Sequence, residues 1–309
     1  MQLIVFSDFK KFTLTGDFLR FKSFYICLTI NQLNFLTMKK LLASAFALMT
    51  MSFSYAQANL DVTTQVGNWN ESDVIQVGFM NQNAVLQVGN RNDAEVDQYG
   101  AFNTNLAVSL GNRNSIDVDQ VGIANSNVSF QDGNRNSAKT EQYGIFNSVE
   151  QLQVGNRNDA YAGQLGIANE INQTQMGRRN AASATQIGVG NLADQIQIGR
   201  RNDATALQIG LGNEIFQGQV GNDNTANHTQ LGTDNSAVSL QWGDDNTTMG
   251  LQIGSDNSIF QMQVGEGNFA SDLQIGNNNN STLMQFGDDH VHFGNQFGNN
   301  NNLTTIQSN

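Results

Sequence analysis

From residue 65 onward, polar and small residues return at one fixed spacing along the chain. Gln occupies every eleventh position over 65–307, with Ser109 as the one substitution. Glycine follows two residues after each Gln position over 67–298, and Asn follows three residues after each glycine over 70–301, except at His290. The repeating unit is Q-x-G-x-x-N-x-(A/I/S/N)-x-x-x. It keeps its register without insertions, which predicts a repeat architecture.

Two folds accommodate an eleven-residue period: a right-handed helical coiled coil and a stack of β-strands. In a helix, the glycine of every unit would cost about 1 kcal/mol. The strand interpretation fits the alternation, because Ser72, Val74 and Gln76 share one face with Asn70. We therefore expect a seven-residue strand from each Asn to the next Gln, followed by a Gly-x-x corner in which glycine adopts a positive φ.

Successive units alternate in character, so the structural period is 22 residues, or two strands per rung. The last turn residue before Asn is Arg at one set of corners and apolar or small at the other. The inward pair is small in one set of strands, as in Ala160 and Ala162, and larger in the other, as in Ile171 and Gln173. We predict an all-β fold: a flattened two-sheet parallel β-solenoid of about 11 rungs over residues 59–309, with cross-β stacking about 4.8 Å apart.

The inward amides predict hydrogen-bonded ladders along the solenoid axis. Buried amides are costly when unpaired, but in stacked rungs each can donate to the same residue type above and accept from below. The absence of proline fits this arrangement, because each strand residue has to donate a backbone N–H to the next rung. The predicted ladder and corner positions include Gln65, Gly67, Asn70, Gln76, Gly78, Asn81, Gln153, Gly155, Asn158, Gln164, Gly166, Asn169, Gln296, Gly298, Asn301 and Gln307.

A leader-like segment precedes the repeats. Met38-Lys39-Lys40, a short apolar run over 41–51 and an A-x-A site ending at Ala58 predict a secretory signal peptide at 38–58. We expect residues 1–37 to lie upstream of the true start. Of 15 basic and 27 acidic residues, six and two precede residue 59, which leaves 9 and 25 and a net charge of −16. That charge disfavours general binding to nucleic acids or anionic membranes. Residues 59–309 contain no cysteine, so no disulfide is expected.

Charged residues gather at one set of corners, with Arg in the earlier units and Asp in the later ones. One interpretation is that these charges act as gatekeepers against premature aggregation. The other is a stripe that binds a polyanion, such as an acidic polysaccharide or extracellular DNA. The residues are Arg91, Arg113, Arg135, Arg157, Arg179, Arg201, Asp223 and Asp245.

The outward faces of the two strand sets are also expected to differ. One set carries apolar pairs such as Leu106 and Val108 or Phe260 and Met262, and the other carries acids such as Asp117. A one-sided apolar face suggests lateral bundling or contact with a surface. Simple tolerance of apolar residues in a repeat protein is the alternative.

The sequence indicates no catalytic, cofactor-binding or metal site. The stretch Asp-Asp-His-Val-His over 288–292 could hold a metal through two His on one strand face. However, His290 replaces a ladder Asn, so degeneration of a terminal rung is the preferred interpretation. His228 shows no evident partner, and Asp244 and Asp245 lack an accompanying base or nucleophile. Enzymes on β-helix scaffolds have long loops that build a cleft, and the uninterrupted register argues against one here.

The unit closely resembles the curlin repeat, as the stretch Gln153-Val-Gly-Asn-Arg-Asn158-Asp-Ala160 and the following Gln164 show. The resemblance covers essentially all of residues 59–307. It implies a subunit of curli, which are extracellular functional amyloid fibres of biofilm matrix that support adhesion. It also implies a secreted, cell-surface location reached through the periplasm. The implied partners are a nucleator subunit and an outer-membrane secretion channel with accessory proteins.

Self-assembly also follows from the pattern without the resemblance. Solenoids usually need caps at their ends, whereas end rungs that stay in phase expose strand edges and open amide ladders to another copy. We expect a secreted, self-assembling structural subunit, the major one of its fibre, that forms a head-to-tail homopolymer. The alternatives are a curli nucleator subunit and a monomeric β-solenoid surface adhesin. We expect no enzymatic activity, no cofactor and no specific nucleic-acid partner.

Overall fold

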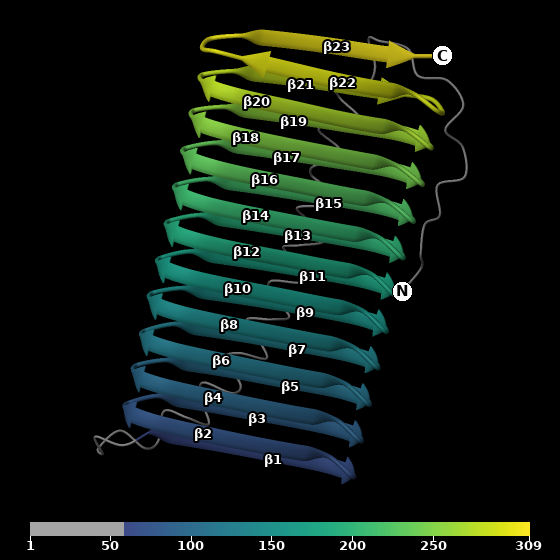
Figure 1. The fold of residues 1–309 in the computed structure, drawn as a ribbon. Helices are drawn as coiled ribbons and strands as arrows, with labels where there is room; N and C mark the ends of the chain where they lie inside the picture. The colour runs from purple at the N-terminus through teal and green to yellow at the C-terminus, as the bar shows by residue number, and fades with distance from the viewer. Residues whose placement is uncertain (1–58) are drawn as a thin grey trace, which may run out of the picture. The chain divides into compact units, whose positions relative to one another are not determined.

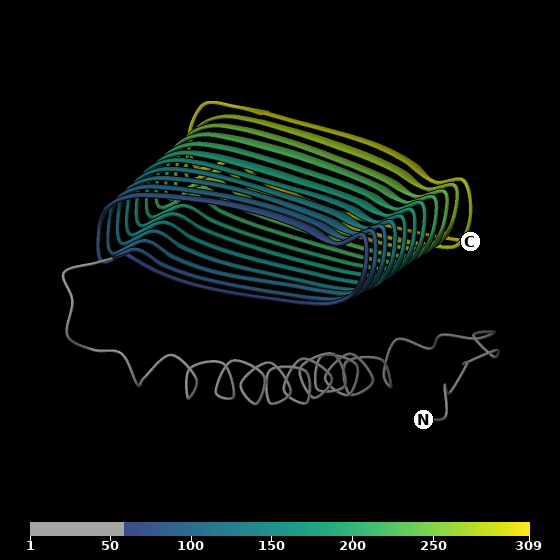
Figure 2. The same ribbon diagram turned by 90° about the horizontal axis from the view of Figure 1, so that it is seen from below.

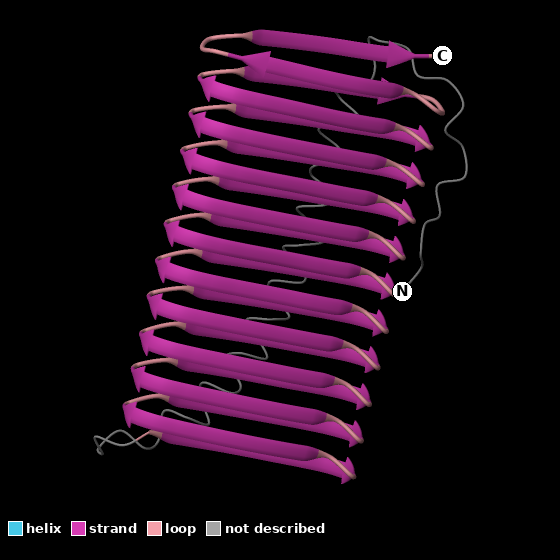
Figure 3. Cartoon of the chain, in the orientation of Figure 1, coloured by secondary structure: helices cyan, strands magenta, loops and turns pink. Residues whose placement is uncertain are grey.

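The computed structural model describes residues 59–309, and the predicted signal peptide and upstream segment lie outside this range. Within it, strands alternate with short corners (Figure 3), of two residues up to β21 and of four residues at 287–290 and 298–301. The strands are β1 (Leu60–Asn68), β2 (Glu71–Phe79), β3 (Gln82–Asn90), β4 (Asp93–Ala101), β5 (Thr104–Asn112), β6 (Ser115–Ile123), β7 (Ser126–Asn134), β8 (Ser137–Ile145), β9 (Ser148–Asn156), β10 (Asp159–Ile167), β11 (Glu170–Arg178), β12 (Ala181–Val189), β13 (Leu192–Arg200), β14 (Asp203–Leu211), β15 (Glu214–Asn222), β16 (Thr225–Thr233), β17 (Ser236–Asp244), β18 (Thr247–Ser255), β19 (Ser258–Glu266), β20 (Phe269–Asn277), β21 (Asn280–Phe286), β22 (Val291–Phe297) and β23 (Asn302–Ser308).

The strands form two parallel sheets that the chain visits in turn. The odd-numbered strands from β1 to β23 make a 12-stranded sheet, and the even-numbered strands from β2 to β22 make an 11-stranded sheet. Each strand pairs with the strand 22 residues later, so that Gln65 lies beside Gln87 and Gly67 beside Gly89. Figure 1 shows the resulting stack of rungs, and Figure 2 shows the sheets as the long sides of a flattened coil. The predicted two-sheet parallel β-solenoid with a 22-residue period is confirmed.

The strands are longer than the predicted seven residues. Strands β1 to β20 have nine residues each, begin one residue after the repeat Asn and continue through the glycine to the residue beyond it. The glycines still pair between rungs, which is why the ladder persists past the last Gln. The Asn that we expected to open each strand instead lies in the corner. Only β21, β22 and β23 have seven residues.

Two positions at each corner have positive φ, whereas the sequence predicted only one. The glycines adopt φ values such as 124° at Gly155. Here even the smallest side chain is excluded, because a Cβ atom on Gly155 would overlap the carbonyl oxygen of Gly177 in the next rung. The residue two positions later is also left-handed, as at Arg91 with φ 58° and Met80 with φ 53°. For a residue with a Cβ atom this conformation costs about 1 kcal/mol or more.

The core between the sheets is thin and filled by complementary sizes. Around the middle rungs, Ile171 and Ile215 of the odd sheet share a buried cluster with Ala184 and Ala206 of the even sheet, as the small-against-large pattern predicted. In the early rungs the pattern is less regular, because Ile116 and Val118 of the even sheet share a buried cluster with Val85 and Ala107 of the odd sheet. Within the described part of the chain, no helix is long and apolar enough to cross a membrane.

Candidate functional site

Gln side chains form a continuous ladder in the even sheet and a ladder in the odd sheet that is interrupted at Ser109. Gln76 Nε2 donates to Gln98 Oε1 at 2.6 Å, and Gln153 Nε2 donates to Gln175 Oε1 at 2.9 Å. The second N–H of each Gln crosses to the facing sheet, as where Gln153 Nε2 donates to Ser137 O at 2.7 Å. The ladders therefore fix the axial register and also tie the two sheets together. The sequence indicated the first of these bonds but not the second.

The repeat Asn residues form a different kind of ladder at the corners. The side-chain oxygen of Asn136 accepts the backbone N–H of Asn158 at 3.0 Å, one rung further on. The amide nitrogen of Asn158 donates to the carbonyl oxygen of Gly177 at 3.2 Å. Asn169 repeats this arrangement at the other corner with Asn147 and Gly188. The repeat Asn therefore binds the same glycine turn that excludes a side chain, which explains why the two residue types occur together.

The Gln ladders extend to the first and last described rungs. Gln65 donates to Gln87 at 2.8 Å, and Gln307 accepts from Gln285 at 2.7 Å. Gln76, Gln296, Asn70 and Asn301 also occupy regular ladder positions. Within residues 59–309, β1, β2, β22 and β23 each pair along one edge only. Each end of the solenoid therefore presents strand edges and ladder amides in the register of the interior.

Two further inward positions of the odd strands hold short ladders that sequence reasoning missed. At the first, Asn105 Nδ2 donates to Asn83 Oδ1, and Asn127 Nδ2 donates to Asn105 Oδ1, both at 2.7 Å. At the second, two residues further along the strand, Gln occupies the odd strands β9 to β15, and Gln151 donates to Gln173 at 2.9 Å. The signal lay in the recurrence of Asn four residues before the repeat Gln position in the early rungs and of Gln two residues before it in the later ones.

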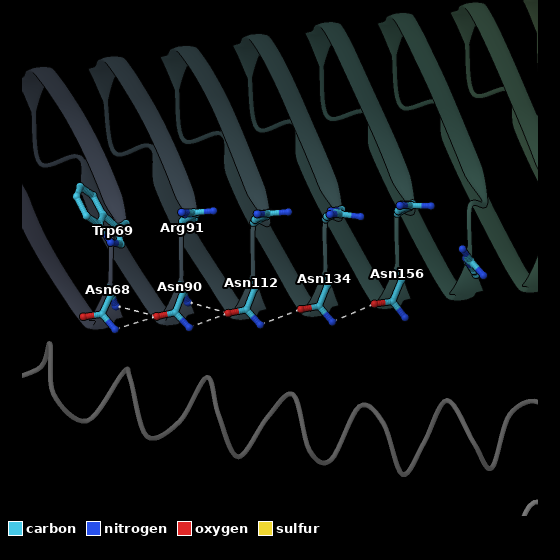
Figure 4. A pocket seen from close by; sticks show the side chains of 11 residues that line it. Asn68, Trp69, Asn90, Arg91, Asn112, Asn134 and Asn156 are labelled. Carbon is cyan, nitrogen blue, oxygen red and sulfur yellow. Dashed lines mark hydrogen bonds between the residues drawn. The ribbon is translucent and has the colours of Figure 1, made fainter.

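A row of exposed Asn and Arg residues follows the corner at which the odd strands end (Figure 4). Asn90 Nδ2 donates to Asn112 Oδ1 at 2.9 Å, and Asn134 Nδ2 donates to Asn156 Oδ1 at 3.0 Å. We call this row, with the arginines beside it, the Asn–Arg strip. It lines the pocket of Figure 4 with Asn68, Trp69, Asn90, Arg91, Asn112, Arg113, Asn134, Arg135, Asn156, Arg157 and Arg178, and it continues through Arg179, Arg200 and Arg201. The Asn row was not predicted.

The predicted corner charges stack one rung apart on this strip. Repulsion from Arg135 and Arg179 lowers the pKa of Arg157 below its ordinary value. Arg201 forms an ion pair with Asp223, the first acid of the following rungs. From Asp223 onward, the equivalent corner positions carry Asp223, Asp245 and Asp289, with Gly267 between the last two. The corner therefore consists of a positive segment followed by a negative one.

Exposed apolar side chains recur from rung to rung at the opposite corner, where the even strands end. Leu165 is 54% exposed, Phe146 62% and Leu211 50%. By contrast, Val108 and Met262, which we expected on an outward apolar face, are only 2% and 3% exposed. The expectation of an exposed face along the odd strands was therefore wrong for these two residues. The apolar surface is a stripe along one corner instead.

His228 has partners that the sequence did not reveal. Its ring is buried, with Nδ1 3.1 Å from Gln217 Nε2 and Nε2 donating to Gln261 Oε1 at 3.2 Å. Burial lowers the pKa of His228 to about 4. Gln261 in turn donates to the buried carboxylate of Asp272 at 2.8 Å. The result is a polar chain that crosses the core.

The two His residues near the end of the chain point to different partners. His292 Nε2 lies 3.4 Å from Asp272 Oδ1 in the core, whereas His290 Nε2 lies 3.1 Å from the Phe286 carbonyl. The backbone N–H of His290 still donates to Asn268 Oδ1, as a ladder Asn would. Among residues 59–309, no three His, Asp or Glu side chains gather in a way that could hold a metal ion.

These features define a class of protein: a cross-β solenoid whose inner amides form axial ladders and whose rungs continue in register to both described ends. The family model of the curlin associated repeat matches residues 62–100. This segment contains three repeat Gln-to-Asn turns that have the same geometry as the rest of the stack. Residues 62–100 therefore carry a curlin associated repeat, which agrees with the resemblance seen in the sequence. None of the curated proteins compared with the chain matches it. The repeat and the fold point to a structural rather than an enzymatic protein.

Proposed function

We propose that the chain is a secreted subunit of a curli-like extracellular fibre that assembles head to tail through its end rungs. The observation that carries the proposal is the state of β1, β2, β22 and β23, each of which pairs along one edge within the described residues. Such edges are templates for further strands. A second copy can extend both sheets and every ladder, and a contact of this heterologous kind continues into a filament.

The repeat geometry also sets the expected fibre dimensions. Eleven rungs at about 4.8 Å give each subunit a length of roughly 53 Å along the fibre axis. Because the strands lie across that axis, the fibre should show the cross-β spacing throughout. Long uniform subunits suit the major component of such a fibre better than a nucleator. A nucleator and an outer-membrane secretion channel with accessory proteins remain the proposed partners.

Fibre growth from diluted, denatured residues 59–309 tests the proposal. We expect a lag that preformed seeds shorten, followed by fibres with a meridional reflection at about 4.7 to 4.8 Å. Concentration-independent folding to a stable monomer would instead support the adhesin alternative.

Substitutions in the end rungs test the mode of assembly. Replacing Gln65 and Gln307 with Leu removes ladder contacts at both ends, so we expect slower seeded elongation. The matched control replaces Thr64 and Thr304 with Ala, because these residues lie on the same strands and face outward. Equal slowing by both pairs would contradict growth through the ladders, whereas circular dichroism of the soluble protein shows whether each variant still folds.

A further inference from the structure

We propose that the Asn–Arg strip binds one extended acidic polysaccharide, a polyuronate, laid along the solenoid axis. This inference goes beyond fibre formation, because the strip is complete within a single subunit. It decides between the two interpretations of the Arg corner in favour of a binding role. It therefore assigns to this surface a ligand that the fibre itself does not require.

The strip concentrates positive charge on an otherwise acidic molecule. Eight of the nine basic residues of 59–309 lie on it, across six consecutive rungs. Arg201 has an ion pair with Asp223, but none of the other strip arginines lies within salt-bridge distance of a carboxylate in the described residues. The lowered pKa of Arg157 reflects this uncompensated repulsion. An anionic ligand would relieve it.

The strip also presents donors rather than acceptors. Asn90 Oδ1 already accepts from both the backbone and the side chain of Asn68, and Asn112 Oδ1 accepts in the same way from Asn90. Each Asn amide has two N–H donors and uses one of them on its neighbour. The second amide N–H and the guanidinium groups have only donor capacity to offer. This chemistry selects a ligand rich in carboxylate oxygens.

The spacing favours a sugar polymer over a nucleic acid. Successive arginines repeat once per rung, about 4.8 Å apart, whereas phosphates on one strand of duplex DNA advance by about 3.4 Å. An extended polyuronate carries one carboxylate on each sugar ring and so can match one carboxylate to one rung. Single-stranded nucleic acid binds through a series of aromatic platforms, and the strip has one aromatic residue, Trp69, at its first rung. Trp69 is 83% exposed and can pack against the face of a single sugar ring.

The acidic segment limits the length of the bound polymer. Beyond Arg201, the next corner residues are Asp223 and Asp245, which repel carboxylates. The positive segment therefore spans six rungs, or roughly 29 Å. Oligouronates should bind more tightly as they lengthen to about six sugars, with little gain per site beyond that length.

The left-handed backbone at the corner determines which substitutions of the arginines can be made without disturbing the fold. Arg113, Arg135 and Arg157 all have left-handed φ values near 58°. Asn occupies the equivalent turn position at the opposite corner, at Asn278 and Asn300, with φ values of 53° and 57°. A triple Arg→Asn variant at 113, 135 and 157 therefore removes charge while keeping a residue that tolerates this backbone. A triple Arg→Lys variant keeps the charge. The control Ala124→Asn with Ala168→Asn introduces Asn at the opposite corner without removing any charge.

The test measures binding of fluorescent hexamannuronate to the purified chain, both as soluble protein and as fibres. We expect binding in both states, weakening with salt, with an affinity loss of tenfold or more in the triple Asn variant. The triple Lys variant and the opposite-corner control should keep most of the affinity. Because the soluble protein is assayed separately, failure of fibre formation does not affect this result.

Three outcomes would overturn the inference. The first is hexamannuronate binding that is unchanged in the triple Asn variant. The second is tighter binding of single-stranded DNA of equal charge, which would assign the strip to nucleic acid. The third is no polyuronate binding, with lateral fibre association lost both in the triple Asn variant and on replacing Asp223 and Asp245 with Asn. That result would assign the strip to contact with the acidic segment of a second copy.

Discussion

The imidazole ring of His228 fits into the core because the paired residue on the next strand is Gly250. A Cβ atom on residue 250 would come within 2.5 Å of the ring carbon Cδ2. On the other side, His228 pairs with Ala206, which belongs to a column of small inward residues. One large ring in this column is therefore accommodated by the absence of a side chain one rung away.

Replacing Gly250 with Ala should destabilise the solenoid by about 1 to 3 kcal/mol, because the new methyl group overpacks the core against His228. In a His228→Ala background the same change should be neutral or stabilising, since it recreates the stacked Ala184 and Ala206 of earlier rungs. Denaturant unfolding of the four proteins of this cycle measures the coupling. Independent, additive effects of the two substitutions would show that the ring and Gly250 do not constrain each other.

Solenoid stability should fall as the pH is lowered from 6.5 toward 4. The pKa of His228 is about 4 in the folded protein, against an ordinary value of 6.5. The unfolded chain therefore binds the proton first, so the stabilising contribution is complete above pH 6.5 and is lost as the pH falls through the folded value. The shift corresponds to roughly 3 kcal/mol. Unfolding curves at several pH values should show this loss in the wild type but not in His228→Ala.

The sequence predicted the fold because every repeat contains the residues that determine its strand and its corner. The fixed spacing of Gln, glycine and Asn specified rung length, sheet number and register, and the alternation of Arg with apolar corners revealed the period of 22. The network around His228 could not be read in this way. It depends on Gln261 and Asp272, which are 33 and 44 residues away and are brought together only by stacking.

The corner conformation shows a second limit of sequence reasoning. Arg91 and Phe102 have left-handed φ values, although such residues rarely adopt them. The signal for a left-handed conformation at this turn position was weak. It consisted of the few units in which the position holds glycine, such as Gly190 and Gly212. The Asn row beside the arginines was missed because it occupies a variable position of the repeat unit, directly after the glycine, and gives way to Arg at Arg178 and Arg200.

The two kinds of corner glycine should respond differently to substitution. Gly155→Ala should prevent correct stacking or cost about 3 kcal/mol or more, because the methyl group meets the Gly177 carbonyl and the φ of 124° disfavours any side chain. Gly190 has a φ of 65° and nothing within 4 Å of an added Cβ atom. Gly190→Ala should therefore cost about 1 kcal/mol. Comparable losses in unfolding free energy for the two variants would contradict the role assigned to the rung-to-rung contact.

Lys139 should stabilise the acidic face of the even sheet at neutral pH. Its ammonium group lies 3.1 Å from both Asp117 and Glu141. Around it, Asp117 raises the pKa of Glu95, and burial raises the pKa values of Asp97 and Asp119. These carboxyls repel one another along the stack, and Lys139 is the one cation of residues 59–309 outside the Asn–Arg strip.

Replacing Lys139 with Met should therefore lower stability at pH 7 by no more than about 1 kcal/mol, since the ion pairs are partly exposed. A carboxyl with a raised folded pKa binds its proton more readily in the folded state, so its unfavourable contribution disappears as the pH falls through that value. The deficit of Lys139→Met should accordingly shrink on acidification and in high salt. Because protonation of His228 acts in the opposite direction, the comparison is made in a His228→Ala background. A deficit that is constant with pH would mean that Lys139 acts through packing of its alkyl chain rather than through charge.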